Sequence, residues 1–172
     1  MDCLVKNIVF RVDSSIDIGF GHVMRCLTLA KALVSKHTSI LFICRKQEGD
    51  LISHIKSKGF QVFELPEINN RDKNLGFLGT SQLHDAKDCY DVLENFVPDL
   101  LIVDHYSIDF NWQKQLKNRF KKLMVIDDLG NRRHNPDFIL DQNFGSNELK
   151  YKSLVPKNCI QLLGPNYTLL RK

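Results

Sequence analysis

NIVFRVDSSIDIGFGHVMRCLTLAKALVSK, residues 7–36, contains the pattern that decides the fold. An apolar, β-branched run at residues 8–12 predicts a buried strand. A polar loop with two glycines follows at residues 13–21, and a helical spacing of apolar side chains begins after it. The members of that apolar stripe are Val23, Leu27, Ala30 and Val34. A strand that leads through such a loop into a helix is the opening unit of a parallel α/β sheet.

The rest of the chain continues this alternation. Strands are expected at residues 38–44, 60–66, 99–105, 122–128, 137–143 and 160–164. Helices are expected at residues 49–59, 82–96 and 109–120, with a polar loop at residues 67–80. Their predicted inward positions are Leu51, Ile52, Ile55, then Leu83, Ala86, Tyr90, Leu93, then Trp112, Leu116 and Phe120. Several strands are apolar on both faces. The sequence therefore predicts an α/β fold, doubly wound, with a mostly parallel sheet and helices on both faces.

Length, composition and charge predict one globular domain. The 172 residues, 43% hydrophobic and 26% charged, suffice for a full core. The net charge is +4, and the basic residues at 114–122 and 150–172 are interpreted as solvated surface, not as a nucleic-acid interface. No apolar run approaches the roughly 20 residues that cross a bilayer, and the first residues do not resemble a signal peptide. We therefore expect no stable membrane anchor and a cytoplasmic location.

The cysteines indicate a reducing compartment. Cys3, Cys26, Cys44, Cys89 and Cys159 are scattered and odd in number, without a CxxC pair or a zinc-like Cys/His spacing. We expect reduced thiols that behave mostly as small buried groups.

The loop before the first helix is the strongest candidate site. In a doubly wound sheet, ligands bind beyond the C-terminal ends of the strands. Gly19 and Gly21 allow a tight turn and a close approach, and the helix start that follows favours a diphosphate. Met24 stands where a dinucleotide fingerprint needs its third glycine, and no Gly-Lys-Ser/Thr completes a P-loop. The two glycines alone fit a plain strand-to-helix turn equally well.

His22 makes the loop a candidate for catalysis. An imidazole that faces the crevice could take a proton from water near neutral pH, and the helix start disfavours its cationic form. Alternatively, His22 is a polar residue that only caps the helix or contacts solvent. The residues alone leave both interpretations open.

Further polar residues stand where other strands end. Asp104, His105 and Tyr106 end the fourth strand, Asp127 and Asp128 the fifth, and Asp141 and Asn143 the sixth. Carboxylates gathered in this way could bind a divalent cation, but they more often cap helices and bond loop backbone. The Tyr106 hydroxyl could donate a hydrogen bond to a sugar or phosphate, or simply remain in water beside a packed ring.

Four stretches together resemble a known family. They are RVDSSIDIGFGHVMRCLTLAKAL (11–33), LLIVDHYSID (100–109), VIDDLGNRRHNPDFILDQN (125–143) and LLGPNYTLLR (162–171). In this order and spacing the chain is similar to the UDP-2,4-diacetamido-2,4,6-trideoxy-β-L-altropyranose hydrolases, close to the spore-coat polysaccharide family. The first stretch is the most specific, and the resemblance spans essentially the whole chain.

The resemblance implies a GT-B architecture, with the active site between two Rossmann-like domains. Residues 1–165 would be the first domain and residues 166–172 the start of a linker to a C-terminal nucleotide-binding domain that this chain lacks. The implied reaction is water attack at the anomeric carbon of a UDP-sugar, with inversion, on the route to pseudaminic acid and without metal or cofactor. His22 would be the base and Tyr106 would lie near the substrate. The substrate-binding residues expected are Arg11, Asp13, Gly19, Phe20, Gly21, Arg25, Asp104, His105 and Tyr106.

Other functions remain open on this pattern. A GT-B glycosyltransferase would place an acceptor hydroxyl where the hydrolase places water. A split transferase would pair this chain with a separate nucleotide-binding chain, which stands in for the second domain. In either arrangement we expect the isolated domain to be inactive and to bind UDP weakly. A phosphoryl-accepting receiver domain is disfavoured, because its acidic pair should follow the first strand, where this chain has its glycine-containing loop and His22.

Overall fold

The structure, a computed structural model, describes residues 6–170 apart from the side chain of Lys73. It contains one seven-stranded parallel sheet with the order β3-β2-β1-β4-β5-β6-β7. The strands are β1 (Lys6–Val12), β2 (Thr38–Arg45), β3 (Gln61–Leu65), β4 (Leu100–Asp104), β5 (Lys122–Ile126), β6 (Phe138–Asp141) and β7 (Ile160–Leu163). This arrangement confirms the predicted α/β, doubly wound fold. Cys3, Arg171 and Lys172 lie outside the described residues.

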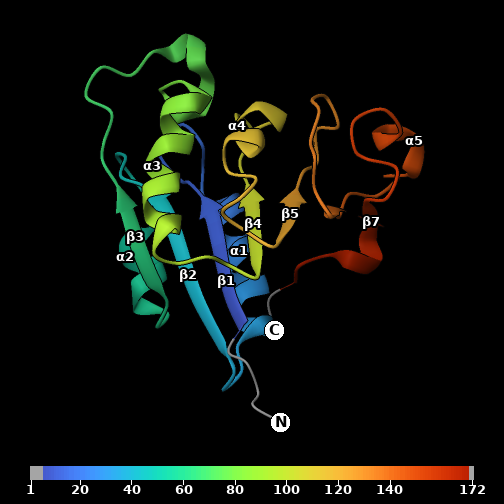
Figure 1. Cartoon of the computed structure of the whole chain (residues 1–172), viewed down its shortest axis with the longest axis horizontal. Coiled ribbons are helices and arrows are strands. Elements are labelled where there is room, and N and C mark those ends of the chain that lie inside the picture. The colour runs from blue at the N-terminus through green and yellow to red at the C-terminus, as the bar shows by residue number, and fades with distance from the viewer. Residues whose placement is uncertain (1–5, 171–172) are drawn as a thin grey trace.

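Helices cover both faces of the sheet, as Figure 1 shows. The α-helices are α1 (Gly21–Leu33), α2 (Ile52–Ser57), α3 (Gln82–Glu94), α4 (Phe110–Gln115) and α5 (Glu148–Tyr151), and the 3-10 segments are η1 (Lys73–Leu78) and η2 (Pro165–Tyr167). Alternate residues of β1 belong to different cores. Phe10 packs with the α1 and α2 side chains, whereas Val9 packs with those of α3 and α4. This alternation produces the continuous apolar runs in the sequence, because both faces of a central strand are buried.

The predicted inward face of α3 was right for Ala86 and Leu93 but wrong for Leu83 and Tyr90. Leu83 is 64% exposed and Tyr90 is 38% exposed, and the buried positions are Asp85, Ala86, Cys89 and Leu93. The helix is rotated because Asp85 is buried against two arginines and a tryptophan of the neighbouring elements. A periodicity analysis that assigns every carboxylate to the solvent side cannot anticipate such a pairing.

Several helix boundaries also differ from those predicted. The first helix ends at Leu33, so Val34 is 59% exposed, although the other three stripe residues are buried. The helix after β4 ends at Gln115, so Leu116 and Phe120 follow it, Leu116 still fully buried. The expected loop at 67–80 contains η1, and α5 was not predicted.

The four cysteines within the described residues, Cys26, Cys44, Cys89 and Cys159, are free and buried, as expected. No helix within residues 6–170 is long and apolar enough to cross a membrane.

Candidate functional site

The loop from β1 to α1 is a closed turn that needs one of its two glycines for its shape. Ser15 pairs with Gly19 in an isolated antiparallel bridge, with the Gly19 N–H 2.9 Å from the Ser15 carbonyl oxygen. Gly19 has a φ of 78°, which side chains rarely adopt, whereas Gly21 keeps a negative φ. A Cβ at either glycine would meet no atom within 4 Å. Gly21 is therefore not required by the turn geometry, and the empty space beside it leaves its backbone open to a ligand.

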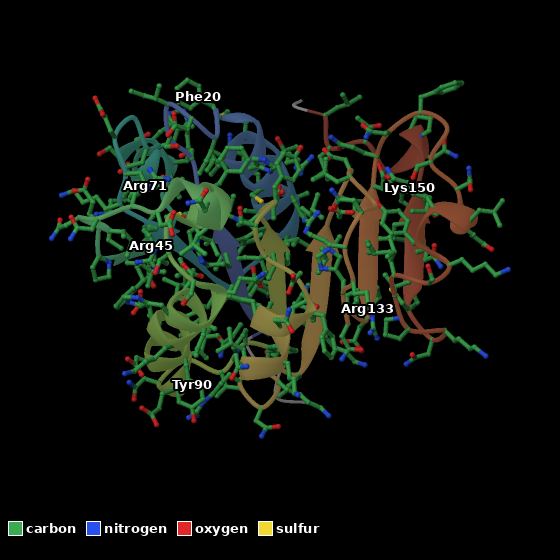
Figure 2. The ribbon with its side chains drawn as sticks, turned by 90° about the horizontal axis from the view of Figure 1, so that it is seen from above. Phe20, Arg45, Arg71, Tyr90, Arg133 and Lys150 are labelled. Carbon is green, nitrogen blue, oxygen red and sulfur yellow. The ribbon has the colours of Figure 1, made fainter. Side chains whose placement is uncertain are left out.

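Phe20 occupies the outer margin of this loop. It precedes the first residue of α1, makes no capping hydrogen bond and is 52% exposed. In Figure 2, Phe20 and Tyr90 of α3 mark opposite sides of the sheet. The first N–H groups of α1 thus lie beside an exposed aromatic ring, on the α1 side of the sheet.

His22 lies in the first turn of α1, against the end of β4. Its side chain is 7% exposed, and its Nδ1 is 2.6 Å from Asp104 Oδ1. Arg25, one turn further along α1, binds both oxygens of the same carboxylate at 2.6 Å and reaches Asp128 at 2.9 Å. The Tyr106 ring meets the His22 ring edge to face, with 4.4 Å between centroids. Residues far apart in the sequence therefore form one cluster at the C-terminal edge of the sheet.

The contacts of His22 define its tautomer. Burial opposes ionisation of Asp104, but the hydrogen bonds from Arg25 and His22 outweigh it and lower the pKa of Asp104 to about 2. An ionised carboxylate only accepts hydrogen bonds, so the nitrogen 2.6 Å away, Nδ1, carries the proton and donates it. Among the described residues no group hydrogen-bonds to Nε2. In the neutral ring Nε2 therefore keeps a free lone pair, which is the arrangement of a general base.

Tyr106 stays protonated beside this base. Burial and then the nearby Asp128 carboxylate raise the pKa of Tyr106 to about 12. Phe77, from η1, stands 6.4 Å from the Tyr106 ring, and its N–H donates to Ser107 Oγ at 2.8 Å. A neutral phenol next to the imidazole can donate a hydrogen bond to a bound oxygen.

Three expected substrate contacts point to the other face of the sheet. Arg11 and Asp13 are both 0% exposed and are paired with each other. His105 is 3% exposed, with Nδ1 accepting from the Ser107 N–H and Nε2 3.4 Å from Asp13. Alternation along the strands separates these residues, on the α3 side, from Asp104, on the α1 side. Their polar atoms face protein partners.

The remaining strand-end acids support loops. Asp127 accepts from the Gly130 N–H and from the buried Tyr151 hydroxyl, and Asp141 accepts from Ser146 and Lys150. Within residues 6–170 no group of three or more His, Cys, Asp or Glu residues could hold a metal ion. The sequence placed Asp128 at the end of the fifth strand but did not predict its contact with Arg25. Phe77 and Asp85 were not predicted as site residues, and neither lies at a strand end that could have indicated them.

Comparison with known proteins adds chemistry to this geometry. The chain is 31% identical over 96% of its length to the UDP-2,4-diacetamido-2,4,6-trideoxy-β-L-altropyranose hydrolase of Campylobacter jejuni. One relative is thus a sugar-nucleotide hydrolase. The present chain is also 26% identical, over 96% of its length, to an uncharacterized protein of Methanocaldococcus jannaschii. The chain covers 52% of the first relative and 31% of the second, and no family model matches it.

Proposed function

We propose that this chain carries the general base of a UDP-sugar hydrolase that acts on a UDP-linked 2,4-diacetamido-2,4,6-trideoxy sugar, in the biosynthesis of pseudaminic acid. The observation that carries the proposal is His22, whose Nδ1–H is donated to Asp104 and whose Nε2 has no hydrogen-bond partner among residues 6–170. The relationship to a curated hydrolase supports the substrate class. The free, buried thiols accord with a reducing, cytoplasmic setting.

In the proposed reaction water attacks the anomeric carbon of the sugar. The new carbon–oxygen bond forms as the bond from that carbon to the β-phosphate oxygen breaks, and the water proton passes to His22 Nε2. UDP leaves with the electron pair of the broken bond, so the anomeric configuration inverts. The N-terminus of α1 and the open backbone at Gly21 can stabilise the negative charge on the diphosphate. Asp104 holds the imidazole in its reactive tautomer while the charge develops.

The uridine-binding part is proposed to come from a second domain, either of the same polypeptide or of a separate chain. The proposal is supported by the first relative, of which this chain covers 52%. We expect residues 1–172 alone to bind UDP no more tightly than the high-micromolar range, because too few contacts are available for a tighter complex. Isothermal titration with UDP measures this, and a sub-micromolar Kd would place the uridine contacts within this chain.

The decisive variant is His22→Ala in a protein that contains both halves. Loss of a general base should lower kcat by about 10²–10⁴-fold with a smaller change in KM. His37→Ala is the matched control, because His37 is half-buried in the turn before β2, at the opposite ends of the strands from His22, and its loss should leave kcat unchanged. A His22→Ala enzyme with normal turnover would show that another group takes the proton.

A glycosyltransferase would use the same geometry with an acceptor hydroxyl in place of water. UDP release from the UDP-sugar, followed with and without added sugar acceptors, separates the two reactions. The hydrolase requires release without an acceptor. Release that appears only with an acceptor would replace this proposal with transfer.

A further inference from the structure

Arg25 has its guanidinium fully committed to the protein. Its side chain is 11% exposed, and each of its three nitrogens faces a carboxylate. Nε and Nη2 bind the two oxygens of Asp104, and Nη1 binds Asp128. A residue occupied in this way is poorly placed to contact a substrate, although it lies beside the proposed base.

The contact between Arg25 and His22 is not a hydrogen bond in the tautomer deduced above. Arg25 Nη2 lies 3.1 Å from His22 Nδ1, but both nitrogens then carry protons. The guanidinium therefore presents its positive charge to the ring without donating a hydrogen bond to it. This contact disfavours the imidazolium form, whereas the Asp104 carboxylate favours it.

We propose that Arg25 is a positioning residue that sets the proton affinity of His22, by sharing the Asp104 carboxylate with the imidazole and holding its own charge against the ring. Without Arg25, the Asp104 carboxylate would act on His22 alone, and a carboxylate–imidazolium pair with a proton on Nε2 would be favoured. With Arg25, the carboxylate orients the ring yet leaves Nε2 free.

Within the described part of the chain, few charged or titratable groups face His22. They are Asp104 from β4, Arg25 from α1, and Tyr106 after β4, with Asp128 after β5 behind Arg25. Tyr106 remains neutral, so the balance at the ring lies between one carboxylate and one guanidinium. The role of these two opposing charges in catalysis rests on the proposed function. Their effect on the titration of His22 does not.

The test is the titration of the His22 imidazole by NMR in the present chain. In Arg25→Met, which keeps a long apolar stem without the charge, we expect the midpoint to rise by about 1 pH unit or more. The His22 signal is assigned by its loss in His22→Gln. Arg119→Met is the control, because Arg119 stacks on Tyr90 and reaches Glu94 on the α3 side, and it should leave the His22 midpoint unchanged.

Two further variants keep the proposal testable. Arg25→Gln, which can still donate to Asp104, should show the same upward shift even where Arg25→Met does not fold. Arg25→Lys retains the charge and should return the midpoint most of the way to the wild-type value. An unchanged or lowered midpoint in the neutral variants would overturn the proposal.

Kinetics then separate this inference from the proposed function. In a protein with both halves, the acidic limb of the kcat/KM profile should move upward with the NMR midpoint. A shifted midpoint in a protein without hydrolase activity would refute the proposed function and leave the Arg25 inference standing. Hydrolysis together with an unmoved NMR midpoint in the neutral variants would refute the Arg25 inference and leave the proposed function standing.

Discussion

Asp85 is the centre of a second buried charge cluster, on the α3 side of the sheet. Its carboxylate accepts hydrogen bonds from Arg11 of β1, Arg45 of β2 and the Trp112 indole N–H of α4. The four side chains are at most 1% exposed. Burial opposes ionisation of Asp85, yet the arginines outweigh it and lower its pKa. A buried charge of this kind is tolerated only while all its partners are present.

Replacement of Asp85 should therefore be costly. Asp85→Asn keeps the shape but leaves two buried guanidinium groups without their shared counter-charge, and we expect a loss of about 3–5 kcal/mol in the free energy of unfolding. Asp88→Asn is the matched control, because Asp88 binds the same Arg45 at 2.7 Å but is 20% exposed. Its loss should stay below about 1 kcal/mol. Urea unfolding of both variants measures the difference, and equal losses would contradict the central role of Asp85.

The cluster around His22 could be predicted in part from the sequence, whereas the cluster around Asp85 could not. His22, Asp104 and Tyr106 could be predicted to meet, because parallel strands end at one edge and the glycine-containing loop marks the first of them. Their hydrogen-bond partners could not, since the partner of a guanidinium depends on side-chain packing. Arg11 and Asp85 are 74 positions apart, and no local pattern links them. Arg11 therefore had the same appearance in the sequence as Arg25, although the structure buries it on the opposite face.

The two glycines of the loop between β1 and α1 have different structural roles. Gly19 has the left-handed backbone that closes the turn on Ser15. Gly21 has an ordinary backbone and empty space where a Cβ would be. The sequence suggested the same role for both, but only the backbone angles assign the turn to one of them and leave the other for close approach of a ligand.

Alanine substitutions should separate these two roles. Gly19→Ala forces a positive φ on a residue with a Cβ and should lower the free energy of unfolding by about 1 kcal/mol. Gly21→Ala meets no steric obstacle in the first turn of α1 and should be neutral or slightly stabilising. Thermal unfolding measures both. In a protein that also contains the proposed second half, we expect Gly21→Ala to raise KM despite its unchanged stability, and a normal KM would show that no ligand approaches there.

The elements that were predicted well are determined by local apolar spacing, whereas the element that was missed, α5, is held by tertiary contacts. Strands buried on both faces and the amphipathic α1 follow from apolar spacing alone. The short α5 has four residues and depends on Asn147, whose side chain accepts from the Leu149 N–H, and on Tyr151, whose hydroxyl binds Asp127 and Asp141. Such an element is held by tertiary contacts, so its own sequence carries little periodic signal.

At the scale of the whole molecule, strand order brings the chemistry together. The sequence predicted a parallel sheet, but it did not specify that β1 lies between β2 and β4. This central position places the ends of the three strands side by side. Alternation then sends Arg11 and Arg45 to the α3 face and Asp104 to the α1 face. One cluster ties the layers together while the other, around His22, faces the candidate site.

This dependence on buried carboxylates should make the molecule sensitive to acid. The pKa of Asp13, of Asp85 and of Asp104 is lowered in the folded state, that of Asp104 to about 2, whereas an unfolded aspartate titrates near 3.9. As the pH falls, the unfolded chain binds protons first, so the stability present above about pH 5 is lost towards pH 2. Asp104 alone should contribute about 2 kcal/mol of this loss.

Urea unfolding at pH 7, 5, 4 and 3, at constant ionic strength, measures the slope. Asp104→Asn removes one of the three carboxylates, so its free energy of unfolding should fall less steeply over this range than that of the wild type, even though it starts lower. The salt-dependent surface pair of Lys56 and Glu64, whose side chains are 49% and 38% exposed, provides the control. Glu64→Gln should leave the slope close to that of the wild type. Parallel slopes for wild type and Asp104→Asn would show that the Asp104 carboxylate does not link the stability of the fold to pH, and that the charge of Arg25 is balanced by other groups.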